Sequence, residues 1–174
     1  PKQQIACTRS FGRPVTDLVP LIEAVSEFAS RAAEKLRKQD SLAGALQVFM
    51  HTSPHRAGPQ LSRSVTVPLR RPTADSRVLA KAAADGMRLM YQPGYQFIKA
   101  GVFLMDLQPA RVNQGELELE PEEGRDRTRL MSAMDALNGR FGKGTLHVGS
   151  TGLQGITRTW GMRQERRTPQ YTTR

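Results

Sequence analysis

Apolar residues over 4–107 recur in some segments at the spacing of helices and in others at the spacing of strands. The order of these segments constrains the fold of this chain more than any other feature. Two segments, 17–39 and 75–91, repeat apolar residues at spacings of three and four, which is typical of amphipathic helices. Four segments have the alternating or continuously apolar character of strands: 4–10, 42–52, 61–69 and 97–107. The order strand, helix, strand, strand, helix, strand predicts an α+β fold, a four-stranded antiparallel sheet with both helices on one face.

The expected core follows from the same spacing. Asp17 and Asp75 can each cap a helix, because an aspartate before the first turn accepts hydrogen bonds from free backbone amides. The buried stripes expected of the two helices are Leu21, Val25, Phe28, Ala32 and Leu36 in the first, and Val78, Leu79, Ala82 and Leu89 in the second. The strand residues expected to face inward are Ile5, Cys7, Leu46, Val48, Met50, Val65, Val67 and Leu69.

The other face of the sheet is expected to stay open. Small polar side chains there suit contact with a DNA backbone, because they let phosphates come close. A merely solvated face explains the pattern equally well. The expected lining is Gln4, Thr8, Ser10, Gln47, Ser62, Ser64, Thr66 and Lys99.

The charge balance favours a polyanionic partner. The chain has 26 Lys and Arg against 16 Asp and Glu, a net charge of +10, and basic side chains release counterions when they meet phosphates. Cys7 is the only cysteine, so no disulfide can form within the chain. Without a signal peptide or a membrane-spanning apolar run, this indicates a protein of the reducing cytosol. The start at Pro1 indicates a fragment of a longer protein.

An acidic stretch separates two basic units. Residues 112–124 contain five glutamates and no basic residue, and include Pro121 and Gly124. We therefore predict a domain at 1–110, a linker at 111–124 and a C-terminal module at 125–174.

The C-terminal module is predicted to be a small α+β unit. Residues 125–138 have helical spacing, with Leu130, Met134 and Leu137 on one stripe. Residues 141–155 contain five glycines, which favours turns, and 145–148 is the expected strand. Trp160 and Met162 are expected to anchor a small core.

No residues form a convincing catalytic or metal site. The three histidines and Cys7 lack metal-ligand spacing, and the glycine-rich stretch lacks the Gly-Lys-Ser/Thr of a P-loop. A two-metal polymerase centre needs clustered carboxylates, whereas Asp106 is the only strand carboxylate expected here.

The linker contains one motif that fits a peptide-binding pocket. In an extended chain Leu117 and Leu119 point the same way and can enter one apolar pocket, while Gln114 fixes the register.

Several short motifs resemble UmuC-type translesion DNA polymerases of the Y family. Thr-Arg-Ser-Phe-Gly at 8–12 sits where that family has Ser-Arg-Ser-Phe-Gly. Further short motifs that resemble those of the family follow in the same order at 31–36, 52–54, 72–76 and 99–102. Beyond the linker the resemblance continues at 130–131, 135, 137–138, 142–145, 160–163 and 168–174.

This resemblance implies a division of labour within a longer protein. The first unit would be the little finger, whose open face lies against the primer–template duplex. The catalytic domains with their Mg²⁺-binding carboxylates would precede Pro1, so this chain would hold no cofactor and be inactive alone. Gln114, Leu117 and Leu119 would bind the sliding clamp, although Gly115 replaces a hydrophobic residue of the family motif. A UmuD-type dimer and a RecA filament are the further partners that the family implies, and a bacterial cytoplasmic location near the nucleoid is implied by the same resemblance.

We therefore interpret the chain as a DNA- and partner-binding fragment. The residues expected to contact phosphates are Arg9, Arg13, Arg63, Arg70, Arg71 and Lys99, with neutral hydrogen bonds from Ser10, Ser62, Ser64 and Thr66. An RNA-binding module of the same strand order is one alternative, but it needs aromatics on the third strand, and 61–69 has none. A protein-interaction scaffold without DNA affinity is the other alternative.

Overall fold

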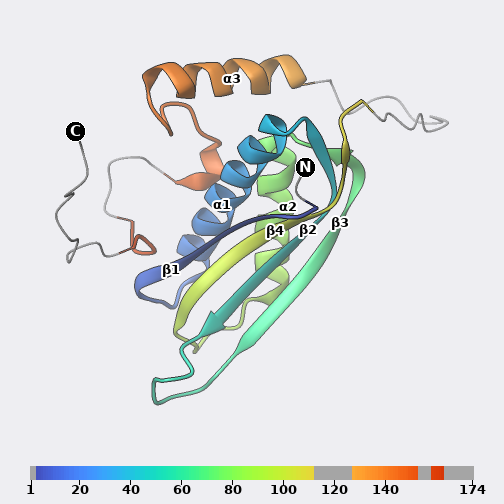
Figure 1. Ribbon diagram of the computed structural model, residues 1–174. Helices are drawn as coiled ribbons and strands as arrows, with labels where there is room; N and C mark the ends of the chain where they lie inside the picture. Colours follow the sequence, from blue (N-terminus) through green and yellow to red (C-terminus); the bar gives the residue numbers. More distant parts are fainter. Residues whose placement is uncertain (1–2, 112–126, 153–157, 163–174) are drawn as a thin grey trace, which may run out of the picture.

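The computed structural model describes residues 3–111, 127–152 and 158–162 (Figure 1). The elements of the first unit follow the predicted order. They are β1 (Ile5–Val15), α1 (Leu18–Lys38), β2 (Ser41–Thr52), β3 (Ser62–Thr73), α2 (Ser76–Met90) and β4 (Phe97–Pro109). After the undescribed residues 112–126 come α3 (Thr128–Phe141) and a 3-10 turn, η1 (Gly149–Thr151).

The four strands form one antiparallel sheet in the order β1-β4-β2-β3. Figure 1 shows α1 and α2 together on one face of this sheet. The core lies between these layers, where Val48 of the central strand β2 stands between Val65 of β3 and Val102 of β4. The predicted α+β fold, with a four-stranded antiparallel sheet and both helices on one face, is confirmed.

The first helix has the predicted buried stripe, while the second differs. All five residues expected of the α1 stripe are buried. In α2, Asp75 accepts a hydrogen bond from the backbone amide of Arg77, as its capping role predicts. The expectation that Val78 and Leu89 face inward is wrong, because their exposed fractions are 40% and 74%. Leu79 and Ala82 are buried as predicted, and the rest of the buried face of α2 consists of Ala80, Ala83, Met87 and Met90, with Ala84 beside it.

The third strand extends four residues beyond its predicted end. β3 continues from Leu69 to Thr73, which pairs with Ala43 after an irregularity in the ladder. β3 is an edge strand, and there a proline costs no ladder hydrogen bond when its nitrogen faces outward. This position accommodates Pro68 and Pro72 within a strand.

The described C-terminal residues, 127–152 and 158–162, pack onto the first unit and build no core of their own. The predicted stripe of α3 is wrong in part, because Leu130 and Leu137 are 52% and 40% exposed, and Met131 is the buried residue. Residues 145–148 form no strand; Asn138 instead holds this loop by two hydrogen bonds to the backbone of Leu146.

The two residues expected to anchor a C-terminal core behave differently from each other. Trp160 is buried and meets Phe28 of α1 edge to face, with ring centroids 5.8 Å apart, so it joins the core of the first unit. Met162 is 43% exposed, and the expectation that it anchors a core is wrong. Within the described residues, no helix is long and apolar enough to cross a membrane.

Candidate nucleic-acid interface

The face of the sheet opposite the helices carries a row of polar side chains that crosses all four strands. Strand register places Lys99 of β4 between Ser10 of β1 and His51 of β2, and His51 in turn pairs with Ser62 of β3. Two further rows follow along the sheet: Thr8, Gly101, Phe49 and Ser64, then Ala6, Phe103, Gln47 and Thr66. The structure therefore brings together Ser10, Ser62, Ser64, Thr66 and Lys99, as predicted.

Aromatic rings, which were not predicted from the sequence, occupy the middle of this face. Phe49 lies 5.5 Å from Phe103 and 6.2 Å from His51, measured between ring centroids. These residues stand on β2 and β4, the two central strands. Strand alternation could have placed Phe49 on this face, because successive side chains of a strand point to opposite faces. Gln47, Phe49 and His51 occupy one set of alternate positions, and the core-facing residues occupy the other: Leu46, Val48 and Met50.

Gly101 makes room for these rings. A Cβ atom at this position would lie 2.6 Å from Cε1 of Phe49 and 2.6 Å from Cγ2 of Thr8. Contacts that short do not occur between carbon atoms without displacement of one of them. The absence of a side chain at Gly101 therefore lets Phe49 lie flat across the neighbouring strand.

Two of the six predicted phosphate ligands lie on the other face of the sheet. Arg63 pairs with Met50, whose side chain is in the core, and its guanidinium donates to the carbonyl of Met90 and the side chain of Gln92. Arg9 is exposed on the edge strand β1 and shares the parity of Cys7, so it stands on the side of α1. The structure does not place either beside Lys99.

The remaining predicted cations lie toward the ends of strands. Arg13 is exposed in the irregular part of β1, between the two regions where β1 pairs with β4. Arg70 and Arg71 are exposed near the end of β3, and each already takes part in an interaction within the chain. Gln114, Leu117 and Leu119, the predicted clamp peptide, lie outside the described residues. Over 3–111, 127–152 and 158–162, no cluster of His, Cys, Asp or Glu has the arrangement of a metal site.

Solved DNA polymerases contain the same fold. An insertion ternary complex of Dbh DNA polymerase matches with a TM-score of 0.51 and 11% identity, covering 61% of this chain and 29% of that chain. A Y-family DNA polymerase chimera of Dbh and Dpo4 matches with a TM-score of 0.50 and 13% identity, covering 63% and 30%. At these identities the likeness is one of fold, shared with one part of a polymerase.

The chain belongs to the impB/mucB/samB family, because residues 2–117 match the model of that family's C-terminal domain. Residues 128–174 match a second model, a domain of unknown function (DUF4113). The chain is 38% identical to the protein UmuC and 36% identical to the protein ImpB, both of Salmonella typhimurium, in each case over 99% of its length. It spans about 40% of the length of these relatives.

Proposed function

We propose that this chain is the little finger and C-terminal module of an error-prone translesion DNA polymerase, and that its open sheet face holds the primer–template duplex. The observation that carries the proposal is the row Ser10, Lys99, His51 and Ser62, which crosses a sheet face that neither helix covers. Short hydroxyl side chains donate hydrogen bonds to phosphates, and Lys99 supplies a positive charge among them. Membership of the impB/mucB/samB family and the fold shared with Y-family polymerases support the same assignment.

The proposed contact is electrostatic and independent of base sequence. Serine, threonine and lysine side chains at these positions reach phosphate oxygens, which are the same at every step of a duplex. A polymerase that copies damaged template needs a grip of this kind, because base-specific contacts would fail at a lesion. Polymerisation itself, with its Mg²⁺ ions, is assigned by this proposal to the remainder of a longer protein.

The proposal is tested by fluorescence anisotropy of the 174-residue chain on a labelled primer–template duplex at several salt concentrations. We expect the logarithm of the binding constant to fall linearly with the logarithm of salt concentration. Lys99→Gln should weaken binding and reduce that slope by about one, the value for one lost phosphate contact. Lys81→Gln is the matched control, because Lys81 is an exposed lysine of α2, on the helix side of the sheet.

Two results would overturn the assignment. Absence of duplex binding by the wild type at low salt would favour the protein-interaction scaffold. Equal losses in Lys99→Gln and Lys81→Gln would show that binding follows net charge and not the open face.

Single-stranded nucleic acid is a second candidate ligand for the same face. The observation that favours it is the pair Phe49 and Phe103 on the two central strands, where bases stack in other sheet-based binding modules. Phe103→Leu keeps the apolar volume and removes the ring. A loss of affinity for a single strand, with duplex affinity unchanged, would support this candidate.

The family resemblance supports three protein partners for the whole polymerase. Gln114, Leu117 and Leu119 are proposed to bind the sliding clamp, and a UmuD-type dimer and a RecA filament are proposed to bind elsewhere. The double variant Gln114→Ala and Leu117→Ala should abolish binding of the chain to an immobilised sliding clamp and leave its duplex affinity unchanged. Unchanged clamp binding would contradict this role.

A further inference from the structure

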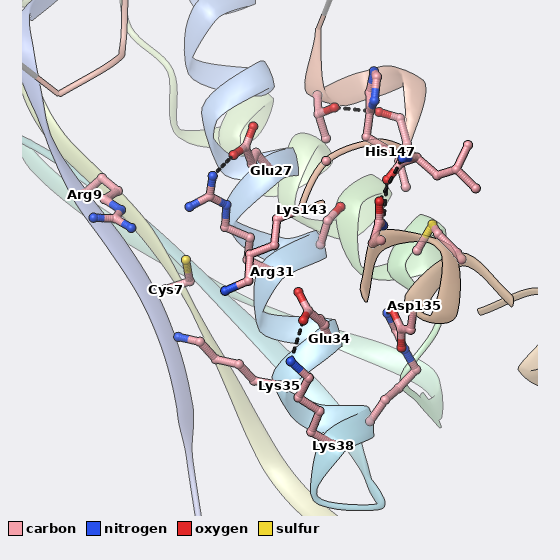
Figure 2. Close-up of a pocket in the computed structure, with 18 of the residues that line it drawn as sticks. Cys7, Arg9, Glu27, Arg31, Glu34, Lys35, Lys38, Asp135, Lys143 and His147 are labelled. Carbon is pink, nitrogen blue, oxygen red and sulfur yellow. Dashed lines mark hydrogen bonds and ion pairs between the residues drawn. The ribbon is translucent and has the colours of Figure 1, made fainter. Parts of the chain in front are cut away.

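A cavity of about 420 Å³ lies between α1, the edge strand β1 and the C-terminal residues (Figure 2). One wall is α1, with Arg31 and Lys35 among its lining residues. Cys7 and Arg9 contribute from β1, and the loop that follows α3 contributes Lys143. The volume is in the range of pockets that bind small ligands. It lies on the helix side of the sheet, so it is separate from the open face described above.

The lining of the cavity has a large excess of positive charge. Three carboxylates, those of Glu27, Glu34 and Asp135, stand against seven cationic side chains. The seven are Arg9, Arg31, Lys35, Arg37, Lys38, Lys143 and Arg158. The uncompensated charge of four favours an anionic ligand, because cations gathered around one cavity repel each other unless an anion lies among them.

The ion pairs show which cations remain available. Glu27 is shared by Arg31 and Arg158. Glu34 pairs with Lys38, and Asp135 pairs with Arg37.

Three cations are left without a carboxylate partner in the described part of the chain: Arg9, Lys35 and Lys143. Lys35 makes one long contact, 3.4 Å from its Nζ to the carbonyl oxygen of Ala6. The three come from β1, from α1 and from the loop after α3, so each wall of the cavity supplies one.

Three cations of the lining lie around the thiol of Cys7. Arg9 and Lys35 have no carboxylate partner among the described residues, and Arg31 shares the single carboxylate of Glu27 with Arg158. Figure 2 shows Arg9, Arg31 and Lys35 arranged around the sulfur of Cys7. The pKa of Cys7 reports the same geometry: burial raises it, and the positive charges of Lys35, Arg31 and Arg9 act against that rise. A raised pKa keeps the thiol neutral at physiological pH, so Cys7 does not neutralise the cations around it.

We propose that this cavity binds a phosphate group, held by Arg9, Arg31 and Lys35 and approached from the C-terminal module by Lys143. Three cations around the thiol of Cys7 fit one multiply charged anion better than a row of single carboxylates. Two of the three are arginines, whose planar guanidinium matches two phosphate oxygens at once. The phosphate can belong to a free nucleotide or to a strand of DNA, and both sources offer the same chemistry.

Occupancy of this site would tie the C-terminal module to the first unit. Lys143 lies beyond the linker, whereas the other three cations lie before it. A bound phosphate would neutralise repulsion between the two sets and stabilise their packing.

The test is calorimetric titration of the 174-residue chain with four probes: sodium pyrophosphate, dATP, a 12-nucleotide poly-dT strand and an eight-residue poly-glutamate peptide. We expect pyrophosphate to bind the wild type. The double variant Arg9→Gln and Lys143→Gln should weaken that binding by about tenfold for each cation removed. The matched control is Arg77→Gln with Lys81→Gln, which removes one arginine and one lysine from the exposed surface of α2.

The probes distinguish the possible sources of the phosphate. Binding of dATP with no cavity-dependent binding of poly-dT would identify a free nucleotide, and the reverse would identify a DNA strand. Poly-glutamate binding as tightly as pyrophosphate would overturn the proposal in favour of an acidic peptide. Equal losses in the two double variants, or no binding of any probe to the wild type, would also overturn it.

Cys7 locates the ligand independently, because it is the only cysteine of the chain. Its rate of reaction with a thiol reagent should fall when pyrophosphate is added. Binding of pyrophosphate without any change in that rate would place the ligand elsewhere and contradict the proposal. Since Lys99 lies on the other face, the phosphate site can be absent while duplex binding persists, and the two proposals fail separately.

Discussion

Arg37 of α1 and Asp135 of α3 form a bidentate ion pair that joins the C-terminal module to the first unit. The guanidinium Nε lies 2.6 Å from one carboxylate oxygen of Asp135, and Nη2 lies 2.7 Å from the other. The third nitrogen, Nη1, donates to the carbonyl of Ala74 and to the hydroxyl of Ser76, at the start of α2. One side chain therefore connects three helices.

Replacement of Asp135 should loosen this junction. Asp135→Ala leaves Arg37 with hydrogen bonds but without its counter-charge, and we expect a loss of about 1–2 kcal/mol in the free energy of unfolding. Asp85→Ala is the control, because Asp85 forms exposed pairs with Lys81 and Arg88 that are worth less than about 1 kcal/mol. Urea unfolding checks both variants. Equal losses would mean that the Arg37–Asp135 pair contributes no more than a surface pair.

Two glycines near the end of α3 should respond in opposite directions to the same substitution. Gly139 lies within the helix with open space where a Cβ would stand, so Gly139→Ala should stabilise by about 0.5–1 kcal/mol. Gly142 has φ +108°, which an L side chain rarely adopts, so Gly142→Ala should destabilise. Thermal unfolding followed by circular dichroism measures both, and a shift of the same sign in both variants would contradict this assignment.

The first unit could be predicted from sequence where one helix face is strongly apolar. The stripe of α1 contains leucine, valine and phenylalanine separated by charged residues, so its spacing defines one face. In α2, alanines occur on several sides of the helix, so the prediction followed the large residues Val78 and Leu89 and gave the wrong buried face. The structure buries Ala80 and Ala83 instead, because α1 and α2 pack closely and small side chains allow that approach.

The C-terminal module could not be predicted in the same way because its packing depends on contacts distant in sequence. Met131 is buried against the backbone amide of Ser76, and Trp160 packs against Phe28. Both partners lie in the predicted first domain, residues 1–110, and not in the C-terminal module. No local pattern in residues 127–162 identifies those partners. The polar part of the open face followed from strand alternation, whereas Phe49 and Phe103 were missed because apolar residues on both faces obscure the period of central strands.

Gly101→Ala should disturb the centre of the open face. The new Cβ must displace the ring of Phe49 and the methyl group of Thr8, and overpacking of this kind costs about 1–3 kcal/mol. The cost should be smaller in a background carrying Phe49→Leu and Thr8→Ser, because those changes remove the contacting atoms. Urea unfolding of the four combinations measures the coupling. Strict additivity would show that the glycine is not required by these two neighbours.

Cys7 should make the stability of the fold depend on alkaline pH. Burial raises the pKa of its thiol above the ordinary value of 9.0, so the unfolded chain loses this proton at a lower pH than the folded chain. The stabilisation is therefore fully present below about pH 9, and it declines as the pH rises from there through the higher pKa of the folded state. Cys7→Ala removes the titrating group, so the difference in unfolding free energy between wild type and variant should shrink between pH 8 and pH 10.5. Comparison of the two chains cancels the titration of the lysines that they share. A difference in unfolding free energy that stays constant over this range would mean that the thiol titrates alike in the folded and unfolded states.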